Sequence, residues 1–287
     1  MIQHLLPPSV SDNYYCLEDL LGEGSFGKVY RGHTLSAPEV SVAIKLPKME
    51  LKLSGILEGY RRTMREAALL QKTSSPQVVR CFDYSRDSSF PYVVMEYVPH
   101  TLATLSPTPQ IVEDIVIQLP EIITALHDAQ IAHCDLRENN IGYVDGTLKL
   151  LDFGLAIPFQ QSVLYMERQV QESLPPEFRR GNIVTKTTDT YSAGRVLERL
   201  LTGEYSASPA KAIAKMKEIY GQEPPRSFQR LLRRMLRPDH FFRPNPMELR
   251  ILAQTALQDL QKNNPFTFEA MVPLADAGID FGISSSS

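Results

Sequence analysis

The stretch GEGSFGKV, at residues 22–29, constrains the fold of this chain more than any other. Its glycines, Gly22, Gly24 and Gly27, follow a G-x-G-x-x-G spacing, which lets a backbone turn lie close over a phosphate chain and bind it with free amides. In a dinucleotide-binding fold this motif opens directly into a helix. Here KVYRG continues as a strand, which favours a β-hairpin and leaves a choice between a phosphate-binding hairpin and a plain turn.

The region up to residue 98 carries strand patterns around a helical one. Residues 16–32, 41–46, 78–87 and 90–98 read as strands, bounded by turn residues. Between them, GYRRTMREAALLQK has apolar residues at helical spacing and no glycine or proline in its interior. These patterns predict a small sheet that carries one helix.

Helical patterns dominate after residues 95–100. The run TPQIVEDIVIQLPEIITALHDAQ begins with Thr108 as an N-cap and Pro109 at the first helical position. Pro120 lies inside it and removes one backbone donor, which predicts a kink or a split. Further helices are expected around residues 189–201, 210–220, 227–236 and 247–260. Because 287 residues are many for a single core, the patterns predict a small β-rich lobe, a short connector and a larger helical lobe.

Composition narrows the class of partner and the compartment. Lys and Arg number 30 against 33 Asp and Glu, a net charge of -3 that disfavours a nucleic-acid or membrane-surface partner, although local basic patches stay open. Three scattered cysteines fit neither a disulfide framework nor a zinc site. The opening MIQHLLPPSV is no secretory signal, and no segment approaches the roughly 20 apolar residues of a membrane span. We therefore expect a soluble, intracellular, cytoplasmic protein.

Lys45 ends the apolar strand VAIK, one hairpin after the glycines. A lysine at the end of a strand is often only a surface residue whose stem packs on apolar neighbours. At this position its ammonium can also reach the α- and β-phosphates of a nucleotide held under the glycine-rich turn. Such a lysine needs a fixed anionic partner, and Glu66 on the predicted helix is the best candidate. Glu58 lies near the helix start, where it suits the helix dipole.

Two polar turns in apolar surroundings carry further chemistry. IAHCDLRENNIG, at residues 131–142, places Asp135 two residues after His133 and Asn140 five residues further on, and a DFG turn then places Asp152. Phosphoryl transfer needs a carboxylate that orients the attacking hydroxyl, together with oxygen ligands for Mg²⁺. Each turn alone can be structural, because Asp, Asn and Gly are common in turns. Both turns, following the glycine-rich turn and the lysine in this order, indicate phosphoryl transfer.

In these motifs and their order the sequence resembles the eukaryotic-type protein kinases over roughly residues 14–260. The resemblance implies an α+β, bilobal fold: a β-rich N-lobe with one helix at 14–95, a hinge at 96–100 and a helical C-lobe at 101–260, followed by a tail at 261–287. It also implies ATP and Mg²⁺ as cofactors and a protein as the substrate, with no nucleic-acid partner. It leaves the oligomeric state open.

The resemblance also carries the family's site residues to matching positions. It implies Asp135 as the catalytic base, Lys45, Glu66 and Arg137 as further catalytic residues, and Asn140 and Asp152 as the Mg²⁺ ligands. The implied ATP contacts are Gly22, Gly24, Gly27, Val29, Ala43, Lys45, Met95, Glu96 and Val98. Met95 matches the gatekeeper, and the residues after it match the hinge. Later positions resemble the end of the activation segment, the central helix and an ion-pairing arginine: Glu177, Asp189 and Arg243.

Four positions depart from the family pattern. Cys134 stands where many kinases have an arginine that binds a phosphate on the activation loop, so we hypothesise that activity does not depend on phosphorylation sensed there. Arg137 replaces the usual lysine and Val170 the usual threonine of Ser/Thr kinases, which leaves the choice between Ser/Thr and Tyr in doubt. Gly142 replaces an apolar residue under adenine, so a thinner floor and weaker ATP binding are expected.

The favoured interpretation is a protein kinase that transfers the γ-phosphoryl of MgATP to Ser or Thr hydroxyls, because no metal or phosphate ligand is missing. A pseudokinase scaffold is the alternative, and the changes at Cys134, Val170 and Gly142 support it. A kinase-like small-molecule phosphotransferase is less favoured. Such enzymes usually lack the full glycine-rich loop and the segment that ends in Pro-Glu, and both are present here.

Overall fold

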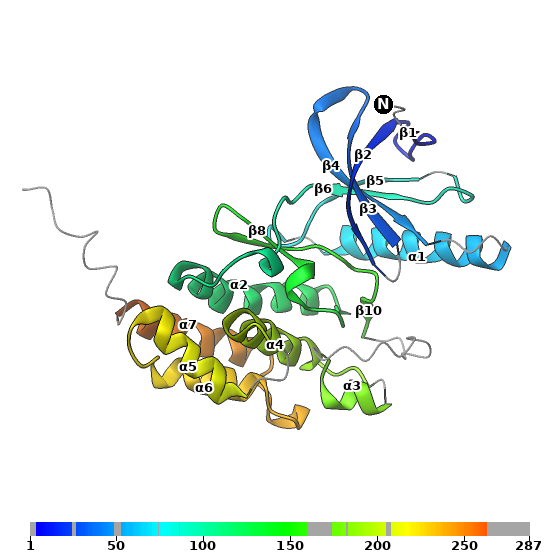
Figure 1. Cartoon of the computed structure of the whole chain (residues 1–287). Coiled ribbons are helices and arrows are strands. Elements are labelled where there is room, and N and C mark those ends of the chain that lie inside the picture. The colour runs from blue at the N-terminus through cyan, green and yellow to red at the C-terminus, as the bar shows by residue number, and fades with distance from the viewer. Residues whose placement is uncertain are drawn as a thin grey trace, which may run out of the picture.

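The computed structural model divides the chain into two lobes (Figure 1). It describes residues 4–24, 27–48, 53–73, 75–85, 87–159, 174–181, 183–204 and 208–262. Within these residues, the N-lobe holds a six-stranded sheet and the helix α1 (Leu53–Lys72), and the C-lobe holds the other helices. The predicted α+β architecture of two lobes is confirmed.

The N-lobe sheet is antiparallel, with its strands in the order β1-β2-β3-β4-β6-β5. The strands are β1 (His4–Leu5), β2 (Tyr15–Glu23), β3 (Gly27–Thr34), β4 (Ala37–Pro47), β5 (Cys81–Tyr84) and β6 (Val93–Glu96). α1 packs beside β4 and β5. The β2–β3 hairpin ends toward the C-lobe, so its glycine-rich end lies over the boundary between the lobes (Figure 1).

Alternation along β4 gives the two faces of this sheet different roles. The buried residues of the outer face form one cluster: Leu6, Tyr15, Val42, Ile44, Tyr92 and Val94. Ala43 and Lys45 point to the opposite face, because successive side chains of a strand alternate. Ala43 packs into the main core that continues into the C-lobe. The period of two therefore directs Lys45 toward the boundary between the lobes.

Residues 4–13 form part of this lobe, which the sequence patterns did not indicate. β1 pairs with β2, and the hydroxyl of Tyr92 donates to the carbonyl of Pro7 at 2.6 Å. Asp83 is buried where this segment meets β5. Its carboxylate accepts hydrogen bonds from Ser9 Oγ (2.6 Å), Tyr84 N (2.9 Å), Tyr15 Oη (3.1 Å) and Asn13 Nδ2 (3.2 Å). Ser9 and Asp83 are 74 residues apart, which is why a local pattern cannot predict the contact.

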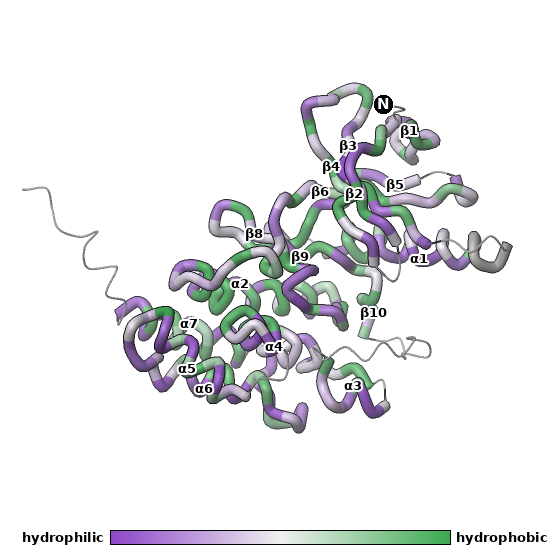
Figure 2. The backbone as a smooth tube through the Cα atoms, viewed as in Figure 1, coloured by the Kyte–Doolittle hydropathy of each residue, from purple (hydrophilic) through white to green (hydrophobic). Residues whose placement is uncertain are grey.

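The helices α2 (Pro109–Asp128) and α4 (Thr188–Thr202) lie at the centre of the C-lobe. α4 is buried along nearly its whole length. The other helices of the lobe are α3 (Pro176–Gly181), α5 (Pro209–Tyr220), α6 (Arg226–Met235) and α7 (Pro246–Lys262), with the 3-10 helices η1 (Leu102–Thr104), η2 (Glu138–Asn140) and η3 (His240–Phe242). Its short strands are β7 (Ile131–Ala132), β8 (Ile141–Val144), β9 (Thr147–Leu150) and β10 (Ile157–Pro158). Hydrophobic and hydrophilic stretches alternate along these helices, as packing on one face requires (Figure 2).

α2 runs without a break through Pro120, so a split of the helix at this proline is ruled out. Thr108 caps the helix as expected, with its side chain accepting from Ile111 N. Packing of α2 against α7, α4 and β9 holds the helix together despite the missing backbone donor. The helix ends at Asp128, directly before the strand and turn that carry the polar motif.

Candidate active site

Lys45, Glu66 and Asp152 form a buried ionic cluster between the lobes. Lys45 Nζ lies 2.7 Å from Glu66 Oε1 and 2.7 Å from Asp152 Oδ1. β4 supplies the lysine, α1 the glutamate and the turn after β9 the aspartate. Since Lys45 and Glu66 are only 7% and 5% exposed, each charge depends on the other for stabilisation. Glu66 is thus the partner of the lysine, and Glu58 instead pairs with Arg62 on the exposed side of α1.

The surroundings of this cluster keep Lys45 and Asp152 ionised. Burial disfavours the ammonium of Lys45, but the carboxylates of Asp152 and Glu66 overcome that effect and raise the pKa of Lys45. Burial likewise acts to raise the pKa of Asp152, yet the Lys45 ammonium and the hydrogen bonds it donates hold that pKa down at about 2. At neutral pH the cluster therefore presents an ammonium and an ionised aspartate to the space between the lobes.

A second set of hydrogen bonds shapes the turn that carries Asp135. Asp189, in the first turn of α4, accepts from the backbone N of His133 at 2.8 Å and of Cys134 at 3.0 Å. Cys134 has φ +63°, a left-handed conformation that a residue with a Cβ rarely adopts, and these two bonds hold the backbone there. Asn140 Nδ2 donates to the carbonyl of Asp135 at 3.0 Å and to its Oδ2 at 2.8 Å. Tertiary contacts thus fix the position of the Asp135 carboxyl.

The carboxyl of Asp135 is only half satisfied by this arrangement. Its Oδ1 is buried and has no hydrogen-bond partner among the described residues, and the same holds for Arg137 Nε. Burial, followed by the charge of Asp152, raises the pKa of Asp135 to about 7. His133 Nε2 is a third such atom in this turn. Buried polar atoms without partners are rare, so three of them in one turn point to a ligand that completes their bonds. A pKa near neutrality suits a group that takes up and releases a proton.

A cavity of ≈ 320 Å³ lies between these groups and the N-lobe sheet. Of the ATP contacts implied by the sequence, those that line it are Gly22, Val29, Ala43, Lys45, Met95, Glu96 and Val98. Asn140 and Asp152 line it as well, so the candidate metal ligands face the same space. Gly24 and Gly27 do not line it; they close the end of the hairpin, where Gly24 N donates to the carbonyl of Gly27 at 2.9 Å.

Further residues line the cavity that the sequence motifs did not single out: Leu21, Val79, Pro99, Thr101, Thr104, Asn139 and Leu151. Leu21 directly precedes the glycine motif and Leu151 directly precedes the DFG turn. Their position next to a motif could therefore have indicated that they line the site. Asn139 lies inside the polar turn, next to Asn140, so it had the same signal. Val79, Pro99, Thr101 and Thr104 lie outside the motifs, where spacing carries no such signal.

Comparison with known proteins decides which family this site belongs to. The family model described as the protein kinase domain matches residues 15–255. The chain belongs to the protein kinase family. The identification as an enzyme of this family, made from the ordered motifs, is confirmed.

Three of the curated relatives of this chain are named as kinases, two of them as serine/threonine-protein kinases. It is 30% identical over 233 residues to "Serine/threonine-protein kinase PrkC" of Bacillus subtilis (strain 168), a match that covers 77% of this chain and 35% of that protein. It is 30% identical over 215 residues to "Serine/threonine-protein kinase PknB" of Mycobacterium leprae (strain TN), covering 69% and 34%. "CTD kinase subunit alpha" of Schizosaccharomyces pombe is 30% identical over 213 residues, covering 70% and 35%. The chain thus spans about a third of the length of these relatives.

The residues of the kinase site fit the ATP and divalent metal that are typical of the family. Asp152 offers carboxylate oxygens and Asn140 an amide oxygen, the hard donors that Mg²⁺ prefers. Across the described ranges, no three His, Cys, Asp or Glu side chains gather as a self-sufficient metal site. A magnesium ion held here would therefore depend on phosphate oxygens and water for its remaining ligands, as Mg²⁺ commonly does.

Gly142 has its space filled by neighbouring side chains. A Cβ at this position would lie 2.4 Å from Val98 Cγ1 and 3.3 Å from Leu151 Cδ2. Val98 and Leu151 both line the cavity, so the hinge and the residue before the DFG turn supply the apolar surface that a larger residue at position 142 would have supplied. Gly142 is thus a close-approach position that lets the hinge side chain pack against β8.

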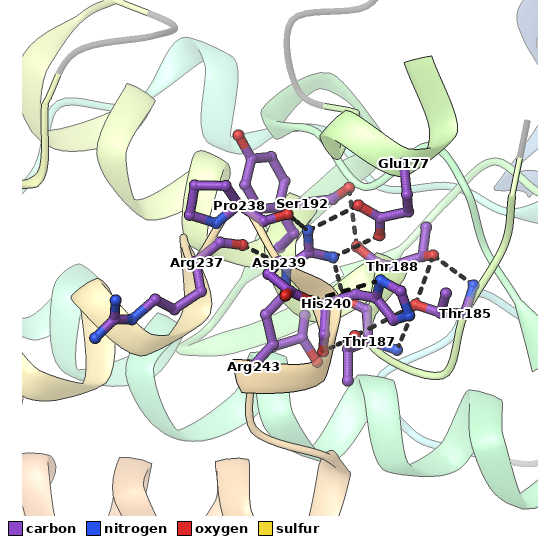
Figure 3. Close-up of polar contacts among 12 residues, drawn as sticks. Glu177, Thr185, Thr187, Thr188, Ser192, Arg237, Pro238, Asp239, His240 and Arg243 are labelled. Atoms are coloured by element: carbon purple, nitrogen blue, oxygen red, sulfur yellow. Dashed lines mark hydrogen bonds and ion pairs between the residues drawn. The ribbon is translucent and has the colours of Figure 1, made fainter. Parts of the chain in front are cut away.

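The end of the activation segment is tied to the C-lobe by a buried ion pair (Figure 3). Arg243 Nη1 and Nη2 lie 2.6 Å and 2.8 Å from the two carboxylate oxygens of Glu177 in α3. The same guanidinium donates to the carbonyls of Arg237 and Pro238, and its carbon lies 4.7 Å from the ring centre of Tyr191. Arg243 is therefore paired as the resemblance implied, and it also joins the segment between α6 and α7 to α4.

Cys134 packs in an apolar cluster at the base of the same segment. The buried members of this cluster are Ala132, Cys134, Ile157, Leu174 and Phe178. Burial raises the pKa of the Cys134 thiol well above its ordinary value, so it carries no charge at neutral pH. The position that binds a phosphate in many kinases is thus an apolar contact here.

Two further sequence expectations concern Val170 and membrane-spanning segments. Val170 lies outside the described residues. In the described ranges, none of the helices has both the length and the apolar composition needed to cross a bilayer.

Proposed function

We propose that this chain transfers the γ-phosphoryl group of MgATP to Ser or Thr hydroxyls of protein substrates. The observation that carries the proposal is the convergence of Lys45, Asn140 and Asp152 on one cavity. Asn140 also holds the adjacent Asp135 carboxyl at 2.8 Å, and that carboxyl has an unused buried oxygen. Phosphoryl transfer depends mainly on positioning and on neutralising charge, and these groups provide both.

In this proposal the cavity holds the nucleotide. Val29, Ala43 and Val98 contact the adenine through apolar surface, Met95 is the gatekeeper, and the backbone of Glu96 and Val98 meets the edge of the ring. Lys45, oriented by Glu66, contacts the α- and β-phosphates under the glycine-rich hairpin. Asp152 and Asn140 would hold Mg²⁺, which when bound neutralises the phosphate charge.

Asp135 acts on the hydroxyl of the substrate. Its Oδ1 accepts the hydrogen bond of the attacking hydroxyl and then its proton, while Asn140 keeps Oδ2 fixed. Arg137, two residues away, contributes a permanent positive charge toward the transferred group. Because the pKa of Asp135 is about 7, this carboxyl is partly protonated at neutral pH before substrate and metal bind.

The choice of Ser or Thr over Tyr rests on the relatives. Two of those described above are named as serine/threonine-protein kinases, and they match at 30% identity. Arg137 in place of the usual lysine keeps tyrosine as the alternative acceptor. The cavity does not distinguish the two, since the acceptor binds outside it.

Phosphorylation of a degenerate peptide library with radiolabelled ATP, followed by phosphoamino-acid analysis, tests the proposal. We expect phosphoserine and phosphothreonine with the wild type and none with Asp135→Ala. The matched control is Asp128→Ala, at the exposed end of α2, which should keep full activity. Equal silence of the wild type and Asp135→Ala would favour the scaffold interpretation, and label in phosphotyrosine alone would reverse the acceptor.

Independence from activation-loop phosphorylation is a further expectation of this proposal. The neutral, buried thiol of Cys134 offers a phosphate no charge-assisted hydrogen bond. Phosphatase treatment should therefore change the transfer rate by less than about twofold, because the apolar cluster and the Arg243–Glu177 pair hold the end of the segment, at residues 174–181, without a phosphate. A fall of the rate to background after treatment would refute this.

A further inference from the structure

The segment from α6 to the start of α7 has a charge opposite to that of the whole chain. Residues 226–251 contain seven arginines and two acidic residues, Asp239 and Glu248, whereas the chain carries a net charge of -3. The overall composition does not exclude a local basic patch. The structure places residues 226–251 at the end of the C-lobe opposite the N-lobe (Figure 1). None of these residues belongs to the cavity described above.

α6 separates its arginines from its apolar residues. Arg226, Arg230 and Arg233 are exposed at spacings of four and three, which line up on one side of the helix. Arg237, two residues after the end of α6, is exposed as well. The buried side consists of Phe228, Leu231, Leu232 and Met235. Among the described residues, no acidic side chain lies within ion-pair distance of these four arginines. The remaining arginine of α6, Arg234, lies 3.7 Å from the carboxylate of Glu248.

The neighbouring helix α5 shows how this surface differs from an ordinary charged one. Its exposed lysines each pair with a glutamate at 2.6 Å: Lys211 with Glu204, Lys215 with Glu218 and Lys217 with Glu223. The positive charge of α5 is thus neutralised locally, while that of α6 is left for an external anion.

Large apolar side chains protrude from the segment that directly follows α6. Phe241 and Phe242 in η3 are 82% and 65% exposed, and Met247 and Ile251 at the start of α7 are 75% and 58% exposed. Met247 and Ile251 are four residues apart, so they lie on one side of α7. Four exposed apolar side chains within eleven residues form a patch of the kind that marks a site of interaction.

The turn that bears the phenylalanines is rigidly held. Asp239 Oδ1 accepts from Phe241 N at 3.0 Å, and Arg243 Nε donates to the carbonyl of Arg237 at 2.7 Å. Arg243 is itself fixed by Glu177, as Figure 3 shows. The buried side of the turn is thus anchored, and the exposed phenyl groups are presented with little backbone entropy left to lose on binding.

We propose that this surface, formed by α6, η3 and the start of α7, docks the chain onto a bilayer that contains anionic phospholipids. The arginines bind headgroup phosphates, for which the planar guanidinium is suited, and the phenylalanines enter the interfacial layer with Met247 and Ile251. Aliphatic side chains gain from contact with acyl chains, which distinguishes this patch from the aromatic stacking surfaces of single-stranded nucleic-acid binders. The docked chain keeps its N-lobe on the side away from the membrane (Figure 1).

Co-sedimentation of the full chain with phosphatidylcholine vesicles, with and without phosphatidylserine, tests the proposal. We expect binding to the phosphatidylserine vesicles alone, weakened by salt. Arg230→Gln/Arg233→Gln/Arg237→Gln should reduce it roughly a hundredfold, at about fivefold for each arginine. Phe241→Ser/Phe242→Ser should reduce it about tenfold. All five side chains are exposed, so the variants are expected to fold like the wild type.

The matched control removes the same charge from the paired helix. Lys211→Gln/Lys215→Gln/Lys217→Gln should change vesicle binding by less than about threefold, because these lysines are already neutralised by glutamates. An equal loss in this control, or no binding by the wild type at low salt, overturns the proposal. Binding to poly-glutamate or duplex DNA but not to the vesicles also overturns it, and assigns the surface to a protein or nucleic-acid partner.

Fluorescence gives an independent measurement of insertion. The chain has no tryptophan, so Phe242→Trp introduces a single reporter. Its emission should shift to the blue with phosphatidylserine vesicles and be quenched by brominated acyl chains. Phe90→Trp, at a position 39% exposed in the N-lobe, should show neither change. Quenching at both positions, or at neither, contradicts docking through η3.

Discussion

Asp83 and Asp135 are the same chemical group in two regions of the molecule, and the structure treats them in opposite ways. Asp83, under the N-terminal segment, accepts four hydrogen bonds, and although burial opposes them these bonds hold its pKa below the ordinary value. Asp135, in the cleft, accepts from the side chain of Asn140 and has one oxygen without a partner, and burial raises its pKa to about 7.

The difference teaches that the number of donors decides what a buried carboxylate does. A carboxylate with enough donors is stable when ionised and holds distant segments together. A carboxylate short of donors is destabilised when ionised, which leaves it ready to accept a proton or a hydrogen bond from a ligand. Asp189 lies between the two, because it accepts two backbone hydrogen bonds and burial raises its pKa to about 6.

Asp135→Asn should have the largest effect. It removes the group that accepts the proton, so we expect phosphoryl transfer to fall about 10³-fold. The folded chain should at the same time become more stable at neutral pH, by about 1–3 kcal/mol, because the ionised carboxylate with its unpartnered oxygen is gone. Steady-state kinetics and urea unfolding of the purified variant measure the two effects. A variant as active as the wild type would remove Asp135 from the chemistry.

Asp83→Ala should give the opposite pair of results. Four donors around the N-terminal segment lose their acceptor, and unfolding should become easier by about 3 kcal/mol. The transfer rate for each folded molecule should stay the same, because Asp83 lies on the far side of the sheet from the cavity. Ser9→Ala, which removes a single donor, should cost only about 1 kcal/mol. A loss of activity without a loss of stability would contradict the comparison.

Asp189→Asn tests the intermediate case. An amide can accept only one of the two backbone hydrogen bonds that fix His133 and Cys134, so stability should fall by about 2 kcal/mol. The turn that carries Asp135 then loses its fixed position, and kcat should fall about tenfold. KM for ATP should hardly change, because neither backbone group lines the cavity. An unchanged kcat would show that the turn keeps its shape without this anchor.

The pH dependence of stability distinguishes the two carboxyls without any substitution at Asp83. Asp135 keeps its proton up to pH about 7 in the folded chain, whereas an unfolded carboxyl loses it near 4, so its contribution to stability is present at low pH. This contribution is lost as the pH rises toward 7, by up to about 1.4 kcal/mol per pH unit. For Asp83, with a lowered pKa, stability is instead lost on acidification. Between about pH 4 and pH 7, the free energies of unfolding of the wild type and of Asp135→Asn should differ increasingly as the pH rises. A constant difference would contradict the raised pKa of Asp135.

The order and spacing of motifs predicted much of the site. The polar turns and the strand after the glycine motif are local features, so Asp135, Asn140 and Asp152 could be named as one group without knowledge of the fold. Lys45 could be chosen from its position at the end of an apolar strand, one hairpin after the glycines. Glu66 could be chosen over Glu58 because Glu58 lies near the helix start, where it suits the helix dipole, and the structure pairs Glu66 with Lys45 at 2.7 Å.

The features that sequence could not supply all depend on contacts between distant segments. Val98 filling the space over Gly142 joins residues 44 apart in the chain, and Asp83 finds Ser9 at a separation of 74 residues. The same is true of the protruding η3 turn, which looks like an ordinary loop until α3, α4 and α6 hold it in place.

The sequence by itself determined the chemistry of the cleft and the face of each element on which the reactive groups lie, because both follow from residue type and from the period of a strand or a turn. The tertiary structure alone decided which of those groups are satisfied. Hydrogen-bond donors and charges reach a buried carboxylate only after the chain has folded, and their number sets whether that carboxylate supports the fold or remains free to react.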